Sequence, residues 1–305
     1  MTARFVLPLA LALSLAGCGG DSSPGGRGAI VADGSSTVGP YVSAAAERFQ
    51  REGEAKVTVG ISGTGGGFER FCRGETDLSN ASRPIEEEEN AVCKDNGVEF
   101  AEFQVANDAI TVVVNSANDW ARCLTVEQLK RIWEPGSKVD NWRDVDAAFT
   151  SVRMTLFGPG TDSGTFDYFT AEIVGEEGRS RSDYQASEND NVLVQGVAGD
   201  RGGLGYFGFS YFEENQEKLK AVAIDNGGGC VAPSVRAAQN GMYKPLSRPL
   251  FVYAKKSSLD RSDVRDFIRY MIDHEREIAD AARFIPLTEV QIEKARNKLA
   301  SATGE

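Results

Sequence analysis

Short apolar segments alternate with longer amphipathic segments along most of this chain. Val42, Ala46 and Phe49 recur at the spacing of one helix face, whereas runs of adjacent apolar residues such as 109–114 are typical of strands. Strands are predicted at 29–32, 57–61, 77–82, 103–105, 109–114, 155–157, 203–211 and 249–253, and helices at 42–49, from Phe68, at 124–133, 166–173, 262–281 and 289–300. Because strands alternate with helices, we expect an α/β fold.

The first apolar run ends at a cysteine. Residues 1–17 carry one charge, Arg4, and an apolar stretch too short to span a bilayer, which is typical of a signal peptide. The ending Leu15-Ala16-Gly17-Cys18 resembles the lipobox of bacterial lipoproteins. This resemblance implies cleavage before Cys18, lipid on its sulfur, a linker at 18–28, and a mature chain anchored outside the cytoplasmic membrane. An ordinary signal peptide with a chance cysteine is the alternative.

Charge and length narrow the classes of function. The chain has 33 Lys and Arg against 45 Asp and Glu, a net charge of −12, which argues against a nucleic-acid partner. An acidic protein does not attract anions through its overall field, so any anion site must be built from local dipoles. The part after Cys18 is long enough for two domains of about 100–200 residues, and no later apolar run could span a membrane.

Four further cysteines predict two disulfides in an exported protein. Of the three pairings of Cys72, Cys93, Cys123 and Cys230, we prefer Cys72–Cys93 with Cys123–Cys230, because each bridge then stays within one domain. Zinc binding is the weaker alternative, since there is no C-x-x-C and His274 is the only histidine, in a charged segment expected at the surface. We therefore expect no metal site and no cofactor.

Three predicted strand-to-helix junctions share one composition. Ser36-Thr37, Gly63-Thr64-Gly65-Gly66 and Ser163-Gly164-Thr165 each combine hydroxyl groups with free backbone N–H groups at a helix N-terminus, which is suited to an oxyanion. Helix capping alone would explain any one of them. Because ligands of open α/β sheets bind at the carboxyl ends of the strands, three such junctions favour a shared site.

Four blocks occur in this order: Gly34-Ser35-Ser36-Thr37-Val38, Ile61-Ser62-Gly63-Thr64-Gly65-Gly66-Gly67, Asp77-Leu78-Ser79-Asn80-Ala81-Ser82-Arg83-Pro84 and Asp162-Ser163-Gly164-Thr165. Together they resemble the phosphate-binding proteins of bacterial ABC importers, the PstS type. The resemblance implies a periplasmic-binding-protein fold of two α/β lobes that close on phosphate, and delivery of phosphate to an ABC permease by a monomer without enzymatic activity.

The resemblance also implies individual ligand contacts. It assigns anion binding to the first turn at Ser36, Thr37 and the Val38 N–H, to the Thr64 hydroxyl, and to Ser163, Gly164 and Thr165. Some members have an aspartate where Ser82 stands here, and the family's arginine before the Ser-Gly-Thr turn is replaced by Gly158-Pro159-Gly160. Arg83 is therefore the candidate cation, Arg181 is a second one expected to be solvated, and Asp162 is a candidate acceptor or helix cap.

The predicted lobes are discontinuous in sequence. Residues 29–105 and 248–305 form lobe one, residues 107–247 form lobe two, and each is expected to have a separate sheet. Two rival functions remain: a sensor or a binding protein for another oxyanion such as sulfate or molybdate, and a phosphate-ester hydrolase. The sequence argues against a hydrolase. Its one histidine, His274, lies in a charged segment expected at the surface, and there is no Walker lysine after the Gly-rich loop and no Asp/His metal cluster.

Overall fold

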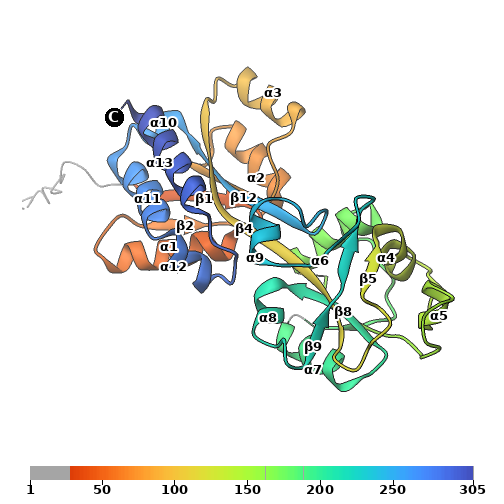
Figure 1. Cartoon of the computed structure of the whole chain (residues 1–305). Helices are drawn as coiled ribbons and strands as arrows, with labels where there is room; N and C mark the ends of the chain where they lie inside the picture. Colours follow the sequence, from red (N-terminus) through yellow and green to blue (C-terminus); the bar gives the residue numbers. More distant parts are fainter. Residues whose placement is uncertain (1–27, 162, 188, 305) are drawn as a thin grey trace, which may run out of the picture.

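A computed structural model describes residues 28–161, 163–187 and 189–304 as an α/β protein (Figure 1). The strands are β1 Ile30–Gly34, β2 Val57–Val59, β3 Leu78–Ala81, β4 Phe100–Asn115, β5 Cys123–Thr125, β6 Thr155–Gly158, β7 Gln185–Ala186, β8 Gly203–Gly208, β9 Leu219–Ala221, β10 Ala223–Asp225, β11 Cys230–Val231 and β12 Ser247–Lys255. The helices are α1 Gly39–Arg51, α2 Gly63–Cys72, α3 Glu87–Asp95, α4 Val126–Trp133, α5 Trp142–Val145, α6 Gly164–Phe169, η1 Thr170–Val174, α7 Asp190–Gly199, α8 Phe209–Glu213, α9 Val235–Gln239, α10 Lys256–Leu259, α11 Ser262–Asp273, α12 Glu275–Ala281 and α13 Glu289–Thr303.

The main sheet is mixed and continuous. Its strands follow the order β2-β1-β3-β12-β4-β8-β6-β7, with β9 paired to β4, and a smaller sheet has the order β11-β10-β5. The first part of β4 pairs with β12, and its last part, Ile110 to Val114, pairs with β8. Figure 1 shows β4 and β12 passing between the two halves of the molecule. The expectation of separate sheets is therefore wrong, because one long strand contributes hydrogen bonds to both halves.

The hydrophobic core is divided on either side of these strands. One cluster joins residues between 30 and 106 to residues between 250 and 299, and a second joins residues between 109 and 246. Ile285 belongs to the second cluster, because its backbone exchanges two hydrogen bonds of 2.9 Å with Asn107. The two halves are thus packed separately although their strands are paired.

We call the part of the molecule that contains β1, β2 and β3 the first half and the part that contains β6 and β8 the second half. The first half places the ends of several strands at one edge of the sheet. β1 lies between β2 and β3 and is parallel to both, so the carboxyl ends of the three strands meet. Tyr41, Val42 and Phe49 of α1 are buried against one face of this sheet, because apolar residues at this spacing share one side of a helix. α2 packs against β1, β3 and α3. Ligand sites in open α/β sheets lie at such an edge.

Both predicted disulfides are present. Cys72 at the end of α2 is bonded to Cys93 in α3, with the Cα atoms 4.2 Å apart. Cys123 in β5 is bonded to Cys230 in β11, with the Cα atoms 6.0 Å apart. The preferred pairing of the four cysteines is confirmed.

Several element boundaries differ from the prediction. α2 begins at Gly63 rather than Phe68, so the Gly-rich segment forms the first turn of a helix instead of a loop. The two strands predicted at 103–105 and 109–114 are a single strand, β4. The helix predicted at 262–281 is interrupted at His274, which is half-buried with its ring 4.3 Å from that of Tyr270 rather than at the surface. No helix within the described ranges is both long enough and apolar enough to cross a membrane.

Candidate functional site

A cavity of about 760 Å³ lies where the two halves meet. The first half lines it with Ser35, Ser36, Thr37, Ser62, Gly63, Thr64, Gly65, Gly66, Ser82, Arg83 and Pro84. The second half contributes Gly164, Asp167, Tyr168, Ala171, Glu172, Glu177, Asn226, Lys244 and Pro245, and the start of β12 contributes Ser247, Arg248 and Pro249. The carboxyl ends of β1, β2 and β3 thus open onto this cavity.

Two helix N-termini on the first wall have no side-chain cap. Val38 precedes α1 and Ser62 precedes α2, and neither side chain accepts a hydrogen bond from the first turn of its helix. Ser35 Oγ accepts a long hydrogen bond of 3.4 Å from the Val38 N–H. In α1 the Gly39 N–H donates to the Ser35 carbonyl at 2.9 Å and Pro40 has no N–H, so this helix contributes mainly its dipole. First-turn N–H groups without side-chain partners, as in α2, suit an anion.

Two hydroxyl groups on this wall are coupled. Thr64 Oγ1 lies 3.0 Å from Ser82 Oγ and accepts a hydrogen bond of 3.3 Å from the Ser82 N–H. Thr64 is in the first turn of α2 and Ser82 follows β3 directly. The junctions after β2 and β3 therefore present one connected pair of hydroxyl groups to the cavity.

On the opposite wall, Gly164 lies close to the turn that precedes α1. Ser163 Oγ accepts a hydrogen bond of 3.2 Å from the Thr165 N–H and so caps α6. A Cβ atom on Gly164 would lie 3.1 Å from the Thr37 N atom, which is closer than side chains normally pack. The start of α6 can therefore lie close to the turn before α1 because Gly164 has no side chain.

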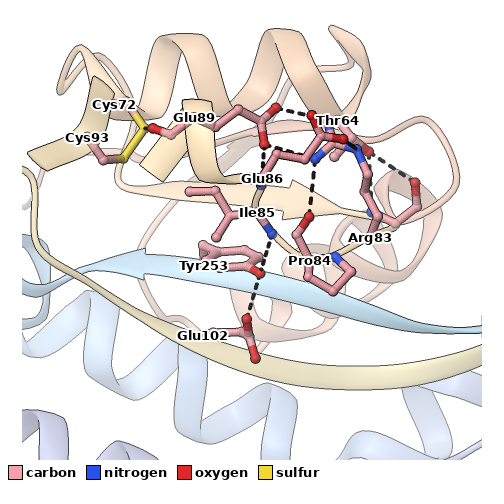
Figure 2. A network of polar contacts seen from close by, with 11 residues as sticks. Thr64, Cys72, Arg83, Pro84, Ile85, Glu86, Glu89, Cys93, Glu102 and Tyr253 are labelled. Atoms are coloured by element: carbon pink, nitrogen blue, oxygen red, sulfur yellow. Dashed lines mark hydrogen bonds and ion pairs between the residues drawn. A yellow bond between two sulfur atoms is a disulfide. The ribbon is translucent and has the colours of Figure 1, made fainter. Parts of the chain in front are cut away.

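Arg83 lies on the wall, but its guanidinium faces acidic side chains (Figure 2). Nη1 and Nη2 each donate to a Glu89 carboxylate oxygen at 2.8 Å, Nε lies 3.2 Å from Glu86 Oε1, and Nη1 also donates to the Pro84 carbonyl at 3.2 Å. Hydrogen bonds to Glu89 raise the pKa of Arg83. Burial raises the pKa of Glu89, but its bonds to Arg83 and to the Glu86 N–H outweigh burial and lower it overall.

The segment after Arg83 is fixed by a second chain of bonds in Figure 2. The Ile85 N–H donates to the Tyr253 hydroxyl at 3.0 Å, and that hydroxyl donates to Glu102 Oε2 at 2.6 Å. The Cys72–Cys93 disulfide joins α2 to the helix that carries Glu89. The hydrogen bonds thus tie the segment after Arg83 to β12 and β4, and the disulfide ties the helix of Glu89 to α2.

Sequence reasoning did not identify Arg248, which enters the cavity from the start of β12. Its side chain is 13% exposed and is paired with Asp108 on β4, the residue opposite it in the sheet register. Nη2 of Arg248 donates to Thr37 Oγ1 at 2.9 Å. In the sequence, Arg248 stands beside a predicted strand at the predicted lobe boundary. Its role could not be inferred from this position alone, because its pairing with Asp108 depends on the register between β4 and β12.

Carboxyl groups also line the cavity. Burial raises the pKa of Asp167, to which the nearby Glu177 adds, while Arg248 opposes the increase. Burial likewise raises the pKa of Glu172, again opposed by Arg248. These groups favour the neutral form more than ordinary carboxyl groups do, and neutral carboxyl groups repel an anion less.

The predicted site residues are only partly brought together. Ser36, Thr37, Thr64, Ser82, Arg83 and Gly164 line the cavity, whereas Val38, Ser163 and Thr165 lie in the adjoining turns but not on its wall. Arg181 is wrongly predicted as solvated: it is 7% exposed, and Ile132 O, Val139 O and Asp183 bind its guanidinium away from the cavity. Asp162 and Cys18 lie outside the described residues. Within the described ranges, no group of three His, Cys, Asp or Glu side chains could hold a metal ion.

Comparison with known proteins identifies the family. The PBP superfamily domain matches residues 19–275 of this chain. Protein SphX of Synechococcus elongatus is 47% identical over 265 residues, which cover 86% of this chain and 78% of the relative. The phosphate-binding protein PstS of Staphylococcus saprophyticus is 38% identical over 301 residues, covering 97% of this chain and 92% of the relative.

A solved structure agrees with these relatives. The crystal structure described as "a possible phosphate binding protein from Planctomyces limnophilus DSM 3776" has a TM-score of 0.86 and 46% sequence identity, and the match covers 90% of this chain and 98% of that one. This chain therefore belongs to the PBP superfamily and, within it, to the family of the PstS-type phosphate-binding proteins.

Proposed function

We propose that this protein captures inorganic phosphate in the cavity between its halves and delivers it to an ABC permease. One observation carries the proposal: the uncapped N-termini of α1 and α2 and the hydroxyl groups of Thr37, Thr64 and Ser82 converge on one wall, opposite the turn before α6. Dispersed donors of this kind hold an oxyanion without a strongly positive protein field. The relatives that are named for phosphate binding support the same ligand.

The cavity closes between two lobes, which we assign to residues 29–105 with 248–305 and to residues 107–247. The separate hydrophobic clusters support this division, and the pairing of β4 with β12 supplies the connection. Ser163 and Thr165 flank Gly164, which already lies close to Thr37 and Ser36, so we assign them to the same ligand as Ser36 and the Val38 N–H. Closure of two lobes around a ligand is a hinge motion.

The family consists of extracytoplasmic substrate-binding proteins rather than enzymes. For this chain we propose cleavage after residue 17, lipid on Cys18, and a monomer tethered to the membrane through residues 18–28. Cys18→Ser should release the protein from the membrane fraction or leave it unprocessed. A Cys18→Ser protein that is still processed and membrane-bound would refute the anchor while leaving the ligand site unaffected.

Calorimetry on the full chain tests the ligand. Titrations with phosphate, sulfate and molybdate at equal pH and ionic strength should show tight binding of phosphate and much weaker binding of the other two. Preference for sulfate or molybdate would make the protein a carrier of another oxyanion. Turnover of a phosphate ester such as p-nitrophenyl phosphate would instead indicate a hydrolase. Loss of phosphate uptake on deletion of the gene would separate a transport role from a sensor.

A further inference from the structure

One arginine on the cavity wall contacts three parts of the molecule at once. Arg248 Nε donates to Asp108 Oδ2 at 3.3 Å, Nη2 donates to Thr37 Oγ1 at 2.9 Å, and Cζ lies 3.6 Å from the centre of the Tyr168 ring. The guanidinium makes no other hydrogen bond with the residues that the structure describes. Since a guanidinium has five N–H donors, both hydrogens of Nη1 and one of Nη2 have no partner among the described residues.

We infer that Arg248 is the principal cation for the bound anion and that Tyr168 and Asp108 position it; this rests on the proposed phosphate-binding function. An N–H donor with a formal charge binds an anion more strongly than a neutral hydroxyl or backbone donor does. Arg248 has such donors uncommitted, and it lines the same cavity as Thr37 and Gly164.

The hydrogen bond between Arg248 and Thr37 also orients the Thr37 hydroxyl group. Because Thr37 Oγ1 accepts from Nη2, one of its lone pairs is occupied and its own hydrogen is left to donate elsewhere. An anion in the cavity would then receive one bond from the guanidinium and one from the hydroxyl that the guanidinium orients. The Arg248 guanidinium and the Thr37 hydroxyl would thus donate to the same anion.

Tyr168 and Asp108 limit the movement of the guanidinium. The Tyr168 ring covers one face of it, and the Tyr168 hydroxyl is itself held by a hydrogen bond of 2.5 Å to the Pro245 carbonyl. Asp108 is 13% exposed and holds the Nε side. A lysine would keep the charge but could not present a planar fork between these partners.

The position of Arg248 on β12 links binding to both halves. Thr37 follows β1, Tyr168 belongs to α6, and Asp108 lies opposite Arg248 where β4 passes between the clusters. An anion bound to Arg248 would therefore lie at the connection between the halves, in the cavity that both walls line.

Arg83 is the other arginine on the cavity wall, and its contacts argue against it. Its Nε, Nη1 and Nη2 are all engaged by Glu89, Glu86 and the Pro84 carbonyl. Only one Nη2 hydrogen of Arg83 lacks a partner among the described residues. To bind an anion through two N–H groups, Arg83 would have to give up part of its bidentate pair with Glu89, whereas Arg248 would keep all its contacts.

The test is calorimetric titration of inorganic phosphate into the full chain carrying Arg248→Met, Arg248→Lys or Arg83→Met. Arg248→Met should raise the dissociation constant about 20-fold or more, the size expected for a lost charged donor, and reduce its dependence on salt. Arg248→Lys should recover only part of the affinity. Arg83→Met should have the smaller effect.

Arg283→Met is the matched control. Arg283 is also stacked on a tyrosine, Tyr211 at 4.7 Å, and also paired with a carboxylate, Glu214, but it lies outside the cavity. Its replacement should leave phosphate affinity unchanged. Parental affinity in Arg248→Met, or a larger loss in Arg83→Met, would overturn the assignment of Arg248. If Arg248→Met does not fold, parental affinity in Arg248→Lys would overturn it. Failure of the parent to bind phosphate would instead refute the proposed function.

Discussion

A Cβ atom on Gly164 would lie 2.5 Å from Thr37 Oγ1 and 3.0 Å from Ser36 Oγ. The two turns belong to opposite walls of the cavity, and the absent side chain is what allows them to touch. Any larger residue at 164 must displace a hydroxyl group or hold the walls apart.

Gly164→Ala should therefore weaken phosphate binding about tenfold, because overpacking costs about 1–3 kcal/mol. The control is Gly199→Ala, at the end of α7 outside the cavity, where no atom lies within 4 Å of a new Cβ. Calorimetry on both variants checks the prediction. Equal dissociation constants for the two variants would show that the contact between the turns is not needed for binding.

Thr64 and Ser82 should act together in binding. Each single alanine variant should raise the dissociation constant roughly two- to tenfold, as expected for a neutral hydrogen bond worth about 0.5–1.5 kcal/mol. Because the two hydroxyl groups lie 3.0 Å apart, the double variant should depart from the sum of the single effects. Thr58→Ala removes a hydroxyl that bonds the Ile30 carbonyl outside the cavity, and should change affinity less than twofold. Strict additivity would argue against the coupling.

Asp167 should oppose anion binding once it is ionised. Burial, with the charge of Glu177, raises its pKa, and only the protonated form leaves the cavity without an added negative charge. Affinity should thus decrease as the pH rises through this raised pKa. Asp167→Asn should bind phosphate more tightly than the parent at about pH 7, and the difference should shrink as the pH falls. Comparing the two proteins at each pH cancels the titration of phosphate itself. Weaker binding by the Asn variant would mean that Asp167 accepts a hydrogen bond from the ligand.

Glu275 should make stability depend on pH. It is 2% exposed, Oε1 accepts the Leu287 N–H at 2.7 Å, and Oε2 has no partner among the described residues. Burial raises its pKa from 4.5 to about 7, while the Leu287 bond and Arg276 act against burial and Asp280 and Glu289 act with it. Since the folded state binds the proton more tightly, stability is lost as the pH rises from about 4.5 to about 7.

Glu275→Gln keeps the acceptor without the charge. Its free energy of unfolding in urea should exceed that of the parent by about 1–3 kcal/mol at pH 8, and the two should converge below about pH 5. Glu277→Gln, on the exposed side of the same helix, is the control and should show no such pH dependence. A difference that is constant across this range would contradict a role for titration.

Local chemistry made much of the site predictable from sequence. Strands followed by Ser, Thr and Gly predicted the turns of both walls, and the glutamates at 86–89 follow Arg83 so closely that their pairing was a foreseeable alternative. Arg248 could not be assigned, because its contacts depend on the register of β12 against β4. Arg181 was misjudged because the carbonyls that satisfy its charge, Ile132 and Val139, come from residues distant in sequence. Contacts between remote segments leave no periodic signal in the chain.

The position of β12 determines the order in which the protein can fold after export. β12 pairs directly with β3, and residues 250–299 complete the hydrophobic cluster begun by residues 30–106. The half that contains the N-terminal strands can therefore complete its hydrophobic core only after the C-terminal residues have been synthesised. Most residues of the other cluster, 109–246, come earlier in the chain. Until the C-terminal segment arrives, β3 has an unpaired edge and α1 lacks the helices α11 and α12 against which it packs. A chain truncated before β12 should therefore leave its N-terminal segment unfolded and prone to aggregation.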